Sequence, residues 1–141
     1  MKVLGDPNSA KIRQAFLRIG SVLQAQMRTN VTGQGLIDTG NLRARILYRV
    51  TQTKDSAVLE VGSFGVPYAA IHEFGYKGPQ SVPAHQRFMS IAFGRAMKNP
   101  RKVDISAHIR QQNIPARPYV RPALQKHQNF ILDIIRQIGK A

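Results

Sequence analysis

Apolar residues recur along the first part of the chain at steps of three and four, which predicts an amphipathic helix. The pattern runs from Ser9 to about Arg28, and Asn8 or Ser9 can cap its first turn. One face of this helix collects five apolar side chains: Ile12, Phe16, Ile19, Leu23 and Met27. The polar, glycine-bearing stretch from Thr29 to Gly35 predicts a loop. We expect the apolar face to lie against the core.

A period of two follows and predicts a β-hairpin from residues 44–53 and 57–62. Tyr48 and Val50 alternate with polar residues in the first strand, and Lys54-Asp55-Ser56 supplies a turn. Pro67 to Phe74 then predicts a short helix, with Pro67 at its first position and Gly75 at its end.

The end of the chain predicts a second long helix, from Pro122 to Ile138, followed by Gly139. Its apolar face comprises Leu124, Ile131, Ile134, Ile135 and Ile138. The order of elements favours an α+β fold in one domain, residues 1–141. In this fold the N- and C-terminal helices pack on an antiparallel sheet.

The sequence between Pro79 and Pro115 predicts a long antiparallel hairpin that protrudes from the domain. Two strand-like arms flank residues 96–100, and each carries a similar tetrapeptide, at 84–87 and 107–110. Folding the chain about residues 96 and 97 places His85 opposite His108 and Arg87 opposite Ser106. We expect residues 82–110 to form this extended arm.

Charge is the strongest global feature of the chain. Its 141 residues contain 21 Lys and Arg against seven Asp and Glu, a net charge of +14 with a pI near 11.2. Nine of the bases lie between Lys77 and Arg121, where Asp104 is the one acid. Such a balance favours a polyanionic partner, either nucleic acid or an acidic protein surface. We expect contacts with neighbouring subunits or DNA at Arg87, Arg95, Lys98, Arg101, Lys102 and Arg110.

The composition of the chain limits the class of protein further. The 43% hydrophobic content is typical of a folded domain, and the absence of cysteine excludes disulfides and thiolate metal sites. The first residues lack the apolar core of a secretion signal. The apolar stretch from Phe130 to Ile138 contains Asp133 and Arg136, so we expect no membrane partner.

Asp38-Thr39-Gly40 after two apolar residues is typical of the active-site turn of a retroviral-type aspartic protease. That mechanism needs two carboxylates that share a proton. However, charged and helix-forming residues follow Gly40, and no later segment of the kind that supports the turn is present. Asp38 or Thr39 is better interpreted as the cap of a helical turn at residues 41–45.

Other catalytic and metal-binding patterns are incomplete. His72-Glu73 begins like a zinc-protease helix, but the position of the second histidine holds Tyr76. The other histidines, at 85, 108 and 127, have no ligand spacing, although His85 and His108 across two strands could hold a metal. Gly62 to Gly65 is no phosphate loop, because no helix with a lysine follows. We therefore expect no enzyme activity, no cofactor and no metal.

Recognition modules for nucleic acids are also missing from the sequence. It has no helix-turn-helix, zinc-finger or aromatic RNA-binding pattern, and only 7% of its residues are aromatic. Any contact with DNA is expected to involve phosphates without sequence preference. A nonspecific basic DNA-binding protein is therefore one alternative interpretation.

Three stretches together resemble the tail-completion, or virion morphogenesis, proteins of tailed bacteriophages, in the Mu-like group and its lambda-like relatives. They are residues 38–43 (DTGNLR), 66–75 (VPYAAIHEFG) and 114–124 (IPARPYVRPAL). Their order and spacing match that family from about Thr39 to the end of the chain. The residues that carry the match are Thr39, Gly40, Leu42, Tyr68, Glu73, Phe74, Gly75, Pro115, Arg117 and Pro118.

The resemblance implies a structural virion protein that is present in the host cytoplasm during assembly. It implies a ring that matches the sixfold symmetry of the tail at its head-proximal end, where the ring enables the head and tail to join. Its partners are then further copies of itself, neck or connector proteins, tail-terminator or tail-tube proteins, and packaged DNA in the channel. A tail-terminator ring that caps the tube is the alternative within this setting.

Glu73 and the hairpin at 82–110 each lead to a structural expectation. Glu73 is one of few acids and precedes a helix-ending glycine, so we expect the guanidinium of Arg117, or of Arg121, to pair with it. The hairpin at 82–110 carries apolar residues that a free two-stranded ribbon cannot bury. We expect it to become ordered only when it packs on a neighbouring subunit or a neck protein.

Overall fold

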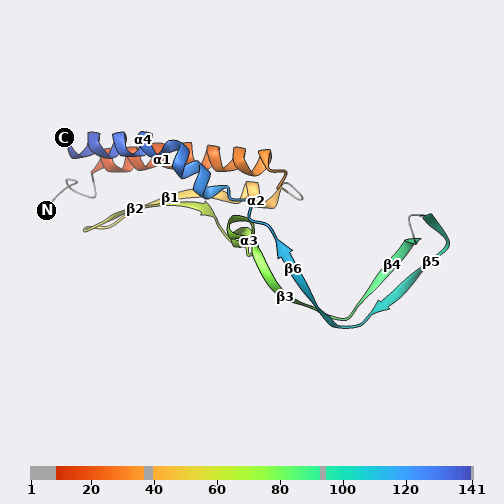
Figure 1. The fold of residues 1–141 in the computed structure, drawn as a ribbon. Coiled ribbons are helices and arrows are strands. Elements are labelled where there is room, and N and C mark those ends of the chain that lie inside the picture. The colour runs from red at the N-terminus through yellow and green to blue at the C-terminus, as the bar shows by residue number, and fades with distance from the viewer. Residues whose placement is uncertain (1–8, 37–39, 93–94, 141) are drawn as a thin grey trace. The chain divides into compact units, whose positions relative to one another are not determined.

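The computed structural model describes residues 9–36, 40–92 and 95–140 (Figure 1). It confirms the mixed fold, with antiparallel strands and a long helix near each end of the chain. Contacts divide the chain into two compact units. The first comprises the described residues up to Gly75 and from Pro115 onward, and the second, the basic arm, is Tyr76–Ile114.

Helix α1 (Ala10–Gly33) confirms the first predicted helix and extends beyond it. The side chain of Ser9 caps it by accepting the N–H of Ile12 at 3.3 Å. The loop predicted from residue 29 is wrong, because the helix continues to Gly33 and places Val31 fully in the core. The polar residues there remain compatible with a helix, since Thr29 and Thr32 donate their hydroxyls to carbonyls one turn earlier.

Strands β1 (Ile46–Gln52) and β2 (Ala57–Ser63) form the predicted hairpin beneath α1. They pair from Ile46 opposite Ser63 to Gln52 opposite Ala57. The short helix α2 (Asn41–Ala44) precedes β1, as expected for a helical turn after Gly40. In Figure 1, α1 and α4 run side by side along one face of this hairpin.

Helices α3 (Ala69–Phe74) and α4 (Val120–Gly139) differ slightly from their predicted bounds. Helix α3 begins two residues after Pro67, and Gly75 follows it with a positive φ of 76°. Helix α4 begins two residues before Pro122, which is tolerated in a first turn because the N–H groups there have no helical acceptor.

The core lies in the first unit and joins α1, α2, β1 and α4. Its buried members include Leu23, Met27, Leu42, Ile46 and Ala123. Most of the predicted α1 stripe is buried, which confirms its assignment to the core. The expected apolar face of α4 is covered only in part, because Leu124 and Ile135 remain 44% and 36% exposed.

The basic arm is an antiparallel ribbon made of two ladders. Strand β3 (Tyr76–Val82) pairs with β6 (His108–Ile114), and β4 (His85–Ala92) pairs with β5 (Arg95–Ile105). Up to Met89, the paired residue numbers add up to the same total in both ladders, so the ladders share one register. The register shifts between Met89 and Ile91.

The predicted ribbon is confirmed, but its bounds and register are corrected. It begins at Tyr76 and ends at Ile114, beyond the predicted 82–110. His85 lies opposite Ile105 and Arg87 opposite Val103, three residues away from the predicted partners. The similar tetrapeptides misled the prediction, because their histidines mark the starts of β4 and β6 and are not a cross-strand pair.

Burial distinguishes the arm from the first unit. No described residue from 76 to 114 is buried, and the side chains of Phe88 and Ile109 are 62% and 73% exposed. A two-stranded ribbon has one layer and cannot cover its own apolar side chains. The expected ordering of the arm on assembly stays a prediction.

Candidate functional site

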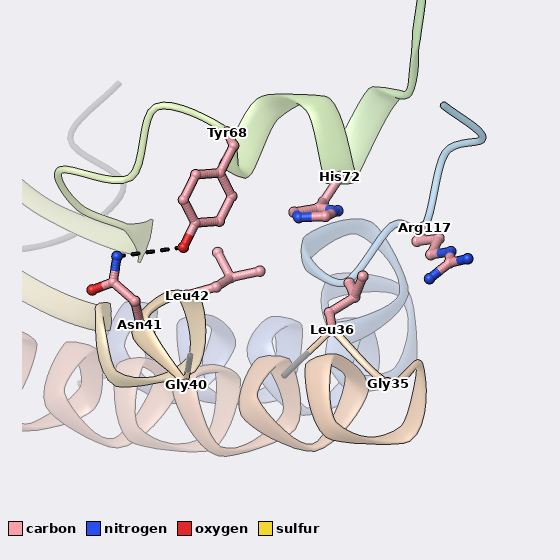
Figure 2. A pocket seen from close by; sticks show the side chains of 8 residues that line it. All are labelled: Gly35, Leu36, Gly40, Asn41, Leu42, Tyr68, His72 and Arg117. Atoms are coloured by element: carbon pink, nitrogen blue, oxygen red, sulfur yellow. Dashed lines mark hydrogen bonds between the residues drawn. The ribbon is translucent and has the colours of Figure 1, made fainter. Parts of the chain in front are cut away.

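The three stretches that carry the resemblance meet around one cavity in the first unit. Its volume is about 570 Å³, and Figure 2 shows its lining side chains. Leu42 comes from the first stretch, Tyr68 and His72 from the second, and Arg117 from the third. Residues far apart in sequence therefore form one local structure.

Polar contacts join the first two stretches at this cavity. The side-chain amide of Asn41 donates to the Tyr68 hydroxyl at 3.3 Å, as the dashed line in Figure 2 marks. The oxygen of the same amide accepts the Nε–H of Arg45 at 3.0 Å. Gly40, whose φ is 72°, occupies the N-cap position of α2, which suits the turn because a left-handed conformation favours glycine. Asp38 and Thr39, the predicted capping residues, lie outside the described part of the chain.

The third stretch is attached through its backbone. The N–H of Arg117 donates to the carbonyl of His72 at 2.7 Å. In the described residues the Arg117 guanidinium has no hydrogen bond or ion pair, and it borders the cavity. The Tyr68 and His72 rings meet edge to face, with centroids 5.7 Å apart. The cavity thus contains Arg and His side chains, and its described lining includes no acid.

Glu73 does not form the predicted pair with Arg117 or Arg121, and that expectation is wrong. Its carboxylate accepts three backbone N–H groups at the start of α4, from Tyr119, Val120 and Arg121, at 2.8, 3.0 and 3.0 Å. The first N–H groups of a helix have no helical acceptor, and they carry partial positive charge. A carboxylate from another element satisfies them, so no guanidinium partner is required.

Tyr119 connects this helix start to the remaining elements. Its side chain is buried, with 2% exposed, and its hydroxyl contacts the Ser63 hydroxyl of β2 at 2.7 Å. Its carbonyl accepts the amide of Asn30, while that of Pro118 accepts the amide of Gln34. Sequence reasoning missed these polar partners, because side-chain amides in a helix give no spacing signal.

Burial determines the ionisation behaviour of Tyr119. Removal of the hydroxyl from water raises the pKa of Tyr119 above its usual value of 10.0. The hydrogen bond with Ser63 acts in the opposite direction, and the nearby Glu73 carboxylate raises the pKa further. The neutral phenol is therefore the form that the fold stabilises.

An apolar groove lies between α4 and β2, above buried side chains of α1. Its volume is about 470 Å³, and all its lining residues are apolar. They include Leu23 and Met27 from α1, Val58 and Leu59 from β2, and Leu124 and Ile135 from α4. Exposed Phe74 lies beside the same surface, in a hollow that shares Val120 and Leu124 with the groove.

The groove exists because the sheet is narrower than the helical layer. Two strands span about 10 Å, whereas two packed helices need roughly twice that width. Helix α1 packs on both strands, and α4 packs on α1. In the described residues β2 pairs only with β1, so its other edge is unpaired beside the groove. Such an edge can accept another strand.

The remaining predicted residues have mainly structural positions. Leu42 is buried in the core, and Gly75 ends α3. Phe74 is 70% exposed, so it is no core residue. The six predicted contact residues of the arm (Arg87, Arg95, Lys98, Arg101, Lys102 and Arg110) are all exposed, and Arg110 donates to the side chain of Gln80 at 2.8 Å.

The described residues contain no group of three or more His, Cys, Asp or Glu side chains that could hold a metal ion. His85 and His108 each contact a backbone carbonyl two residues earlier and do not face each other. Within the same described ranges, no helix combines the length and apolar content that a bilayer crossing requires.

Comparison with known proteins gave no match: no family model, no curated protein and no solved structure matches the chain. The resemblance to tail-completion proteins therefore rests on the three short stretches.

Proposed function

We propose that this chain is a structural protein of a tailed phage, which forms a ring at the head-proximal end of the tail and enables the head to join it. It acts by binding protein surfaces and has no catalytic role. The observation that carries the proposal is the assembly of the three resembling stretches into one structural junction. There, Glu73 of the second stretch holds the backbone of the third at the start of α4.

The roles of these residues support a scaffold. Leu42 fills the core, Gly40 and Gly75 adopt positive φ values where the chain turns, and the Glu73 carboxylate accepts the N–H groups at a helix start. Each of these roles fixes the position of the backbone, and none of them needs a reacting group. A set of short motifs with such roles suits a protein whose surface must be presented in a fixed shape.

The exposed apolar surfaces support assembly into a ring. The groove between α4 and β2 is an apolar surface, and beside it one edge of β2 pairs with no other strand of the described residues. The basic arm carries exposed apolar side chains and further strand edges. A contact between different surfaces of identical copies closes into a ring when the rotation allows it.

The test uses phage particles made without this protein. We expect such lysates to contain DNA-filled heads and separate tails, and purified protein to restore joined, infectious particles. Leu124→Glu places a charge in the groove at a partly exposed position, so we expect it to fold and to lose joining activity.

Leu132→Glu is the matched control, because Leu132 lies on the same helix, is 39% exposed and does not line the groove. Joined particles in the absence of the protein would contradict the proposed role. Equal activity of the two variants would show that the groove is no assembly surface.

A further inference from the structure

The basic arm concentrates positive charge on an extended ribbon. Its 39 residues, Tyr76–Ile114, contain seven Lys and Arg and one acid, Asp104. All seven Lys and Arg residues are exposed, and none forms an ion pair in the described part of the chain. Uncompensated charge of one sign favours a partner of the opposite charge.

The Lys and Arg side chains project from both faces of the ribbon. Opposed residues in an antiparallel ladder share a face, and successive residues alternate. Arg87 and Arg101 are therefore on one face, while Lys102, which lies opposite Phe88, is on the other. A flat acidic protein surface would contact one face, whereas a groove of duplex DNA has a phosphate backbone along each side.

The dimensions of the ribbon fit such a groove. Each ladder has seven paired positions, which corresponds to a length of about 20 Å at 3.3 Å per residue. The major groove is about 12 Å wide and admits a two-stranded ribbon. Several Lys and Arg side chains of the arm could then reach phosphates on both DNA strands.

We infer that the basic arm is a binding element for double-stranded DNA, which contacts phosphates without reading the sequence. Recognition by base stacking needs a series of aromatic side chains, whereas the described part of the arm has two Phe, Tyr or Trp residues, Tyr76 and Phe88. The inference does not rest on the proposed role in head–tail joining.

The test measures affinity of the purified full-length protein for a labelled duplex of mixed sequence across a range of NaCl concentrations. A steep fall is expected, since each neutralised phosphate contributes about −0.9 to the slope of log K against log salt. Replacement of Arg95, Lys98, Arg101 and Lys102 with Gln should reduce the slope by about three to four and affinity at least about tenfold.

The matched control removes the same charge from the first unit, by replacing Lys11, Arg13, Arg43 and Lys126 with Gln. These residues are exposed and form no ion pair in the described structure. We expect the control to keep most of the affinity and slope. An equal loss in both variants would overturn the inference, because it would reflect total charge.

Competition with polyaspartate and with single-stranded DNA separates the other partners. At equal charge, polyaspartate should displace the labelled duplex less well than single-stranded DNA does. Equally effective displacement by polyaspartate would assign the arm to acidic protein surfaces, and tighter binding of single strands would exclude the groove geometry. Failure of head–tail joining with intact DNA binding would contradict only the proposed function.

Discussion

The carboxylate of Glu73 accepts the backbone N–H of Tyr119 at 2.8 Å, which joins the end of α3 to the start of α4. The same carboxylate accepts the next two N–H groups. We expect Glu73→Ala to reduce the free energy of unfolding by about 1–3 kcal/mol, because it leaves polar groups at a helix start without acceptors. Urea denaturation measures this change.

Two further variants test whether the loss of stability in Glu73→Ala comes from the lost contacts at the helix start. Glu73→Gln keeps one acceptor oxygen, loses the charge and leaves at least one of the three N–H groups without its acceptor, so a loss smaller than that of Glu73→Ala, about 0.5–2 kcal/mol, is expected. Glu60→Ala is the control, since its contact with Arg49 is 3.9 Å and exposed, and such pairs contribute about 0–1 kcal/mol. A Glu73→Ala variant as stable as Glu60→Ala would contradict the capping role.

Arg117 leads to the opposite expectation. Only its backbone N–H is used within the described structure, so Arg117→Gln should change the free energy of unfolding by less than about 0.5 kcal/mol. A guanidinium paired with a partly buried Glu73, as the sequence predicted, would instead cost about 1.5–3 kcal/mol when removed. Thermal denaturation of the variant distinguishes these outcomes, and a large loss of stability would restore the original interpretation.

The contrast between Glu73 and Arg117 shows what a sequence can and cannot predict. Periodicity predicted α1 and the β1–β2 hairpin, because burial of one face imposes a repeat of 3.6 or 2. The scarcity of acids and the glycine after the short helix marked Glu73 as important but led to the wrong partner, since backbone N–H groups are present at every position. Only the fold determines which of them lack an acceptor.

The errors at other positions have similar physical causes. The end of α1 was placed too early because polar residues have modest helix propensity, and burial of Val31 overrides it. The register of the arm was misjudged because similar tetrapeptides carry no information on pairing. The cavity beside Tyr68 and His72 was not predicted, since its lining comes from three separate stretches.

Gly20 lies where α1 crosses the hairpin. A Cβ at this position would be 2.6 Å from the Tyr48 ring and 3.1 Å from Leu59, distances that require displacement of packed side chains. We expect Gly20→Ala to destabilise the protein by about 1–3 kcal/mol, despite a helix-propensity gain of up to about 1 kcal/mol. Gly33→Ala is the matched control because a Cβ there meets no atom of the described residues within 4 Å, and it should be neutral or stabilising. The reverse order of stability in urea would contradict the close packing.

Tyr119 predicts a specific loss of stability at alkaline pH. Burial raises the pKa of Tyr119 in the folded state above that in the unfolded state, so the neutral phenol stabilises the fold. This contribution is complete below the unfolded pKa, near 10, and is lost as pH rises through the higher folded pKa.

Tyr119→Phe cannot ionise and loses only the bond with Ser63, about 0.5–1.5 kcal/mol. The difference in unfolding free energy between wild type and variant should therefore shrink as pH rises above about 10. A difference that is constant or grows with pH would contradict the burial effect. The two proteins differ only at residue 119, so the contributions of all other residues cancel in this comparison.

A cryo-EM map of the head–tail junction of virions that carry this protein tests the central claim most directly. The account predicts a ring of copies at the head-proximal end of the tail, with the groove between α4 and β2 covered by a neighbouring protein and the basic arm ordered in the junction. A junction that is complete without density for this chain would contradict the account.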